Sequence, residues 1–196
     1  MSPTWEHRLS IQPQRLLSQV QALSRFRRLR VTFDDAFRSS AGIFPELERL
    51  GLPVTIFVCT GYAREGAPLT IPEFAGDDPE QLATMTWDEL RSQAERGVRI
   101  ESHGVSHAHL PTLGDDELRR ELREAKQEIE DELGTACTEF AYPYGEHDDR
   151  VRAAARSAGY ERAFALWERS RDPYSAPRLD LYRRHGPVRA LLRLYT

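Results

Sequence analysis

The sequence predicts one α/β domain in which parallel strands are joined by crossover helices. Three observations support this fold class: apolar runs alternate with helical segments throughout the chain, polar motifs follow the apolar runs, and 196 residues suffice for one substantial core. The alternation matters because two parallel strands can only be joined by a long crossover, usually a helix. We therefore expect residues 1–196 to form a single domain.

The expected strands are short apolar runs bounded by turn residues. They comprise residues 29–33, 54–58, 98–102, 138–143 and 160–166, with a last strand near Arg178. The run 54–58 is the clearest, because its β-branched residues are typical of a strand that is buried on both faces.

The expected helices are marked by capping residues and glycine stops. They comprise residues 13–28, a stretch that ends at Gly51, and residues 87–96, 115–133 and 148–159. Thr86 and Glu89 form a capping box, and Gly97 and Gly134 end two of the helices. Residues 61–83 are rich in Pro, Gly and Asp, and their apolar residues follow neither the period of a helix nor that of a strand. This pattern predicts a surface excursion.

Composition and charge argue against several classes of protein. The net charge of -4 at pH 7 gives no reason to expect nucleic acid or an anionic membrane as partner. No apolar run is long enough to cross a bilayer, and the first residues lack the apolar core of a secretory signal, so we expect a cytoplasmic protein. Cys59 and Cys137 have no metal-type spacing and are expected to be reduced and packed. Nothing in the composition indicates the oligomeric state.

The stretch "ESHGVSHAHL" (101–110) contains three of the six histidines of the chain. His103 and His107 are four residues apart, which on a helical turn places both rings on one face, within reach of one divalent ion. Two imidazoles need at least one further ligand to form a metal site in a protein. The stretch directly follows the expected strand 98–102, so a third ligand should come from the end of another strand.

Two other motifs also stand at strand ends. Asp34 and Asp35 follow the first expected strand, and "YPYG" (142–145) follows the fourth. Loops at the carboxyl ends of parallel strands converge on one face, so these motifs and the histidines predict a shared cleft. A carboxylate and two imidazoles make a three-ligand site for zinc or a similar ion, and the second carboxylate is then available as a general base.

The order of these motifs resembles the polysaccharide deacetylases of the NodB-homology type, carbohydrate esterase family 4. "TFDD" (32–35) resembles the first motif of that family, "SHGVSH" (102–107) the second and "YPYG" the third, over a span from about residue 31 to 166. The resemblance implies a distorted or incomplete (β/α) barrel. It also implies a metal-dependent hydrolase that removes an N-acetyl group from an amino sugar in a glycan, with one divalent ion, expected to be zinc.

The resemblance assigns a role to individual residues. It implies that Asp34 is the catalytic base and that Tyr144 contributes a backbone N–H to the oxyanion hole. The implied metal ligands are Asp35, His103 and His107. The residues expected at the substrate and its acetyl methyl are Tyr142, Pro143, Leu110 and Trp167.

The chain also departs from the family pattern. Ala36 stands where the family usually has glycine, and Ala141 stands where an arginine commonly orients the base aspartate. We expect Arg178, on the last strand of the sheet, to take that orienting role. The histidine of the last motif, which acts as general acid, has its counterpart in His185, although the spacing differs by one residue.

Two alternatives stay open at this point. The same fold also supports hydrolysis of a non-sugar amide or a cyclic imide. The other alternative is a non-catalytic carbohydrate-binding relic, for which Ala141 and the altered last motif are the support. Retention of the base and of all three implied metal ligands argues against the relic, because a buried cluster of carboxylates and imidazoles destabilises a fold that does not use it.

Overall fold

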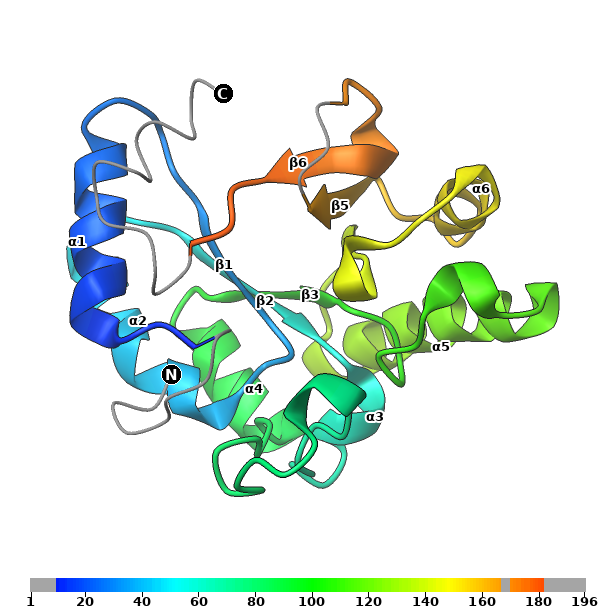
Figure 1. Cartoon of the computed structure of the whole chain (residues 1–196), viewed down its shortest axis with the longest axis horizontal. Helices are drawn as coiled ribbons and strands as arrows, with labels where there is room; N and C mark the ends of the chain where they lie inside the picture. The colour runs from blue at the N-terminus through cyan, green and yellow to red at the C-terminus, as the bar shows by residue number, and fades with distance from the viewer. Residues whose placement is uncertain (1–9, 167–169, 182–196) are drawn as a thin grey trace.

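The computed structural model describes residues 10–166 and 170–181 of the chain. Within these residues, six parallel strands form one sheet in sequence order, from β1 at one edge to β6 at the other (Figure 1). The strands are β1 (Val31–Asp34), β2 (Val54–Val58), β3 (Arg99–Ser102), β4 (Glu139–Ala141), β5 (Arg162–Leu166) and β6 (Ala176–Arg178). The sheet curls into a half-barrel in which β1 and β6 are the two edges, which confirms the incomplete barrel predicted from the sequence.

In the described residues, five helices and five short 3-10 turns connect the strands, and a sixth helix, α1, precedes β1. The helices are α1 (Pro13–Ser24), α2 (Phe44–Arg49), α3 (Thr60–Ala63), α4 (Trp87–Glu95), α5 (Asp115–Leu133) and α6 (Asp149–Ser157). The 3-10 turns are η1 (Arg38–Ile43), η2 (Pro72–Phe74), η3 (Leu110–Thr112), η4 (Pro143–Gly145) and η5 (Pro173–Ser175). Helix α2 packs against β2, α4 and α5 against β3, and α6 against β5, as Figure 1 shows.

Local sequence signals account for the helix ends. The predicted capping box of α4 is present: the Glu89 carboxylate accepts the backbone N–H of Thr86 at 2.8 Å, and the Thr86 hydroxyl accepts the N–H of Glu89. Helix α5 has the predicted bounds and ends at Gly134, whose φ of 64° is the left-handed conformation that glycine adopts without strain. Its buried residues follow the helical period, so one apolar stripe faces the sheet.

The core lies between the helices and the central strands. All five residues of β2 are buried, as the apolar run predicted for a strand covered on both faces. Each large apolar side chain removed from water there contributes about 1.5–3 kcal/mol. Across the described parts of the chain, no helix combines the length and the apolar character that a membrane crossing requires.

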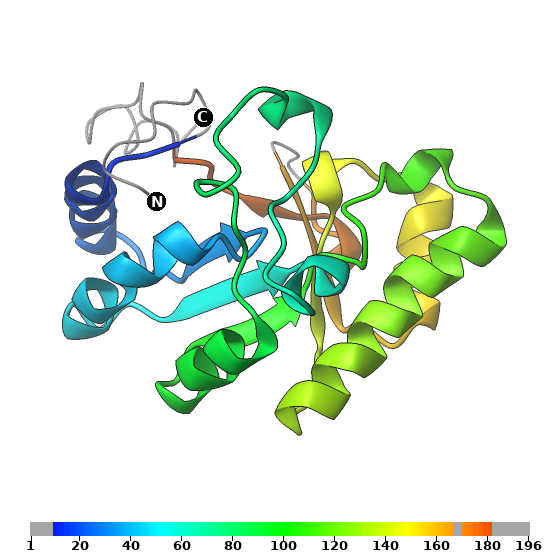
Figure 2. The same cartoon turned by 90° about the horizontal axis from the view of Figure 1, so that it is seen from below.

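The three polar motifs begin at one edge of the sheet. Strand β1 ends at Asp34, β3 at Ser102 and β4 at Ala141, so the loops that follow leave from the same carboxyl edge. The excursion of residues 61–83 projects from this region as a loop of its own (Figure 2). It has an ordered framework, because isolated bridges pair Pro68 with Ala83 and Phe37 with Thr84.

Candidate active site

One carboxylate and two imidazoles meet at the carboxyl edge of the sheet. The Nε2 atom of His107 lies 3.3 Å from Oδ1 of Asp35, and Nε2 of His103 lies 3.6 Å from the same oxygen. Both histidines are almost fully buried. These residues line a cleft of about 610 Å³, together with Asp34 and Tyr144. The shared cleft that the sequence predicts is therefore present.

Backbone strain is concentrated in the same motifs. Four non-glycine residues of the described chain have a positive φ: Asp35 at 67°, Ala36 at 54°, His107 at 59° and Tyr144 at 60°. Such conformations cost of the order of 1–3 kcal/mol each and persist where the surroundings over-determine them, typically at functional sites. The left-handed φ of Ala36 also explains the glycine of the family pattern, because glycine takes this conformation without a steric penalty.

The two histidines do not meet through a helical turn. Residues 103–109 form a loop, so the interpretation of their spacing as one helical face is wrong. The loop is instead fixed by Glu121 of α5, whose Oε2 accepts the backbone N–H groups of Val105 at 2.8 Å and Ser106 at 3.1 Å. The same carboxylate accepts the Ser106 hydroxyl at 2.5 Å. A residue of α5 thus holds the loop that brings His107 back towards His103.

Both imidazoles are neutral, and His103 presents a lone pair to Asp35. Nδ1 of His103 lies 2.7 Å from the carbonyl oxygen of Ala141, which can only accept, so Nδ1 carries the proton and Nε2 is bare. Burial lowers the pKa of His103, and burial together with the neighbouring His103 lowers the pKa of His107 to about 3. The geometry therefore supplies nitrogen ligands in the form that a metal requires.

The donor set fits a divalent metal ion. Oδ1 of Asp35 is buried and accepts no hydrogen bond from any residue that the structure describes. Burial and the adjacent charge of Asp34 raise the pKa of Asp35 well above its usual value. A buried carboxylate oxygen that faces a bare imidazole nitrogen is unfavourable unless a cation lies between them. Asp35, His103 and His107 would hold that ion, and their types match a catalytic zinc site.

Cys59 adds a fourth donor atom that the sequence did not predict. Asp35, Cys59 and His103 offer donor atoms that all lie within 4.8 Å of one another, a group that can hold a metal ion. The Cys59 thiol is fully buried, and it donates to the carbonyl oxygen of His103 at 3.4 Å. Burial raises the pKa of this thiol well above its usual value, so it acts as a hydrogen-bond donor in this structure. The overlooked signal is its position directly after β2, equivalent to the motifs after β1 and β3.

Asp34 differs from its neighbour because Arg178 binds it. Nη1 of Arg178 donates to Oδ1 of Asp34 at 2.6 Å, and Nη2 donates to Oδ2 at 2.7 Å. Burial alone would raise the pKa of Asp34, but the guanidinium outweighs this effect and lowers the pKa to about 2. The predicted contact of Arg178 with the base candidate is present, and the two adjacent aspartates have pKa values shifted in opposite directions.

Ala141 and Arg178 both lie beside Phe57. Ala141 packs with Phe57 and Phe164 in a small buried cluster, and the guanidinium of Arg178 lies 5.3 Å from the centre of the Phe57 ring. The side chain of Arg178 is only 10% exposed. The arginine that the family pattern places on the strand of Ala141 therefore has a counterpart that reaches the same region from β6.

The sequence profile of polysaccharide deacetylases matches residues 24–163, which is more than half of the chain. The chain belongs to the polysaccharide deacetylase family. Among curated relatives, this family member is 24% identical over 132 residues to the Bacillus subtilis protein YxkH, which carries a polysaccharide deacetylase name. The match covers 67% of this chain and 42% of YxkH.

A second relative is chitin deacetylase 1 of Cryptococcus neoformans, 40% identical over 70 residues that cover 36% of this chain and 15% of the relative. This deacetylase-family chain thus spans less than half the length of the curated relatives it matches. Among solved structures, the Streptococcus pyogenes deacetylase PplD superposes with a TM-score of 0.76 at 19% identity, covering 98% of this chain and 92% of that chain. At this identity the likeness shows the shared fold.

The structure places the other expected site residues, Tyr144, Tyr142 and Pro143, in different surroundings. Tyr144 lines the cleft, and its ring stacks on His109 with centres 3.9 Å apart. Tyr142 is 1% exposed and donates its hydroxyl to the carbonyl of Tyr174 at 2.9 Å, so its ring forms a buried wall. Pro143 is buried.

Two of the expected site residues, Leu110 and Pro143, do not line the described cleft. Leu110 is fully buried in the main core and is not part of the cleft lining, because η3 turns its side chain inward. The structure therefore gives no support for Leu110 as a contact of the acetyl methyl. Trp167 and His185 lie outside the described residues.

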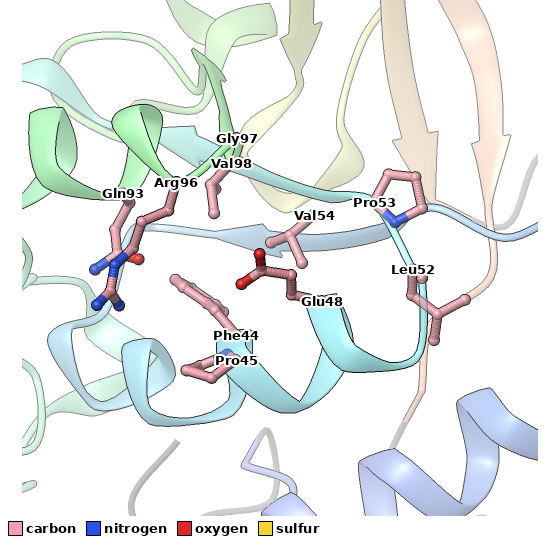
Figure 3. Close-up of a pocket in the computed structure, with 11 residues that line it drawn as sticks. Phe44, Pro45, Glu48, Leu52, Pro53, Val54, Gln93, Arg96, Gly97 and Val98 are labelled. Carbon is pink, nitrogen blue, oxygen red and sulfur yellow. The ribbon is translucent and has the colours of Figure 1, made fainter.

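A second hollow of about 220 Å³ lies at the opposite edge of the sheet, where β2 and β3 begin (Figure 3). Its wall comes from α2, the end of α4 and the residues before both strands. Glu48 is the one acidic side chain among the described residues that line it. Among the described residues that line it, no group of metal ligands and no nucleophile come together.

Proposed function

We propose that this protein is a metal-dependent deacetylase that removes the N-acetyl group from an amino sugar in a glycan or glycoconjugate. The observation that carries the proposal is Asp34, held at two points by Arg178 directly beside the group of Asp35, His103 and His107. Membership of the polysaccharide deacetylase family supports it. The names of two relatives also support it, since one is a chitin deacetylase and PplD was solved with acetate.

The proposed chemistry divides the two aspartates between two tasks. A divalent ion, expected to be zinc, supplies Lewis acidity that lowers the pKa of water and polarises the acetyl carbonyl, so that a carboxylate of low pKa suffices as base. Asp34 takes the proton of the attacking water, and Arg178 keeps this carboxylate ionised and its rotamer fixed. Asp35 serves as a ligand.

The remaining steps need an oxyanion donor and an acid. The backbone N–H of Tyr144 stabilises the oxyanion of the tetrahedral intermediate, on a peptide that the positive φ of this residue holds in an uncommon orientation. The departing sugar nitrogen takes its proton from His185, outside the described residues. A fixed oxyanion-hole donor such as the backbone N–H of Tyr144 accelerates related acyl-transfer reactions by about 10²–10³-fold.

The test combines acetate release with metal analysis. We expect purified protein to hold one divalent ion and to release acetate from some member of a panel of N-acetylated glycans. Asp34→Asn should retain the metal and lose about 10²-fold or more in rate, because only the base is removed. Asp35→Ala and His103→Ala should lose the metal itself. Asp116→Asn, an exposed carboxylate on α5, is the matched control and should behave as the wild type.

Other results would redirect the proposal. Normal metal stoichiometry in both ligand variants would refute the metal assignment, and an active Asp34→Asn would move the base elsewhere. Release of ammonia or a carboxylate from simple amides or cyclic imides, with no acetate from any glycan, would favour the alternative hydrolase. Glycan binding without turnover would favour the relic, against which the intact contact of Arg178 with Asp34 already counts.

A further inference from the structure

The cleft contains one carboxylate that the proposed mechanism does not use. Glu73 belongs to η2, in the excursion, and lines the cleft with Asp34 and His107. Its Oε2 atom is buried and accepts no hydrogen bond from any residue that the structure describes. Buried acceptors without a partner are rare in folded proteins, and each one requires an explanation, because the lost hydration is not repaid within the protein.

The excursion holds Glu73 in a defined place. Leu69, Phe74 and Leu82 form a small core of their own, and the backbone N–H of Leu69 donates to the carbonyl of Leu82 at 2.9 Å. The ring of Phe74, the next residue after Glu73, packs edge-on against Phe37 with centres 5.8 Å apart. A segment with its own buried core and ladder bonds presents its polar side chain in a fixed orientation, as a binding residue requires.

At the carboxyl end of the cleft, no cationic side chain of the described residues forms an ion pair with Glu73. Of the arginines in the described lining, Arg178 forms an ion pair with Asp34, and Arg30 forms one with Glu139. Arg28 precedes β1 and so belongs to the amino end.

We propose that Glu73 is a specificity-determining residue: it accepts hydrogen bonds from the hydroxyl or ammonium groups of the sugar and disfavours glycans that carry a carboxylate. A carboxylate offers two oxygens to adjacent hydroxyl groups, and it forms a charge-assisted bond with the ammonium group of a deacetylated neighbour. A substrate anion in the same partly desolvated space is repelled by like charge. The site therefore takes neutral or cationic amino-sugar polymers, an inference that rests on the proposed deacetylase function.

The experiment compares kcat and KM for acetate release from three probes. These are oligomers of N-acetylglucosamine, the same oligomers after partial deacetylation, and glycans that contain N-acetylmuramic acid. Glu73→Gln keeps the shape and removes the charge, and Glu80→Gln is the matched control, an exposed glutamate of the same excursion that does not line the cleft. Thermal unfolding of each variant checks that the fold is retained.

We expect Glu73→Gln to raise KM for the neutral and cationic probes by about 10-fold, in line with the loss of one charge-assisted bond, while kcat changes little. The preference of Glu73→Gln for neutral over carboxylated glycans should be weaker than that of the wild type. Glu80→Gln should have the kcat, the KM and the preference of the wild type. If Glu73→Gln is active and prefers neutral over carboxylated glycans as strongly as the wild type, the specificity role of Glu73 is refuted, while the deacetylase function stands. An equal change of preference in Glu80→Gln would refute that role as well. A wild type that releases no acetate from any probe overturns the proposed function together with this inference.

Discussion

Replacement of Arg178 by lysine tests the link between the sheet and the chemistry most directly. The guanidinium contacts both oxygens of Asp34, at 2.6 and 2.7 Å, and its side chain is 10% exposed. Lysine offers a single ammonium group that cannot reproduce this planar two-point contact. One charge-assisted hydrogen bond is therefore lost, which is worth about 1.5–3 kcal/mol. If the whole of that free energy contributes to orienting the base in the transition state, kcat falls about 10- to 160-fold.

The assay is acetate release at saturating substrate, with metal content measured on the same samples. Arg178→Lys should lose rate with unchanged metal stoichiometry, because Asp35 and the two histidines are untouched. Arg162→Lys, at the exposed start of neighbouring strand β5, is the control and should keep the wild-type rate. An unaltered kcat in Arg178→Lys would refute the reasoning, since the two-point contact would then be irrelevant to turnover.

A second arm of the same experiment separates the charge from its place in the chain. Arg178→Ala should be slower than Arg178→Lys, because Asp34 loses its cation altogether. Adding Ala141→Arg to Arg178→Ala returns a guanidinium from β4 into the space beside Phe57 and Phe164. We expect a partial recovery of kcat in the double variant. Absence of any recovery, in a protein that still folds and binds metal, would show that the strand of origin matters as much as the charge.

Three further predictions address the metal centre and the core. Glu121→Gln weakens the charge-assisted hydrogen bonds that fix the histidine loop, so the metal affinity should fall about 10-fold. Competition with a chelator measures this affinity, and Glu124→Gln, on the same helix, should leave it unchanged. Cys59→Ser should keep the metal stoichiometry, and the cobalt-loaded wild type should lack a sulfur-to-metal absorption band; a band that disappears in Cys59→Ser would make Cys59 a ligand. Ile129→Ala removes a fully buried side chain of α5 and should reduce the free energy of unfolding in urea by about 2–5 kcal/mol, and a loss below 1 kcal/mol would contradict its place in the core.

The parts of the fold that the sequence predicted depend on local signals. The capping box at Thr86, the stop at Gly134 and the β-branched run of β2 each act within a few residues, and the structure has all three. Helix α1 instead ends at Ser24, short of the expected residue 28, and the short helix α3 was not predicted. The order inside residues 61–83 was also missed, because it depends on side chains that meet across the loop and leave no period in the sequence.

The site shows the same division between local and long-range information. Strand ends predicted that Asp35 and the histidines would converge, since topology alone brings the carboxyl ends of parallel strands together. The way in which the loop turns was predicted wrongly, because it depends on Glu121 from a helix that follows it. The position of Cys59 directly after β2 was an overlooked signal in the sequence, whereas the unpartnered oxygen of Glu73 became visible only in three dimensions.

The half-barrel explains how an arginine can reach Asp34 from a different strand than in the family pattern. Strand β4, which carries Ala141, and strand β6, which carries Arg178, are both parallel to β1 and end at the same edge. Because the sheet curls, the last strand approaches the first without pairing with it, and Arg178 bridges the two edges through Asp34 and, at 3.4 Å, the Thr32 hydroxyl. The cation needs only to reach the end of β1, and any strand that ends beside the cleft with room for a long side chain can supply it. Loss of the contact between Arg178 and Asp34 should therefore increase the mobility of strands β1 and β6 at the open edge of the half-barrel, as well as that of the Asp34 side chain.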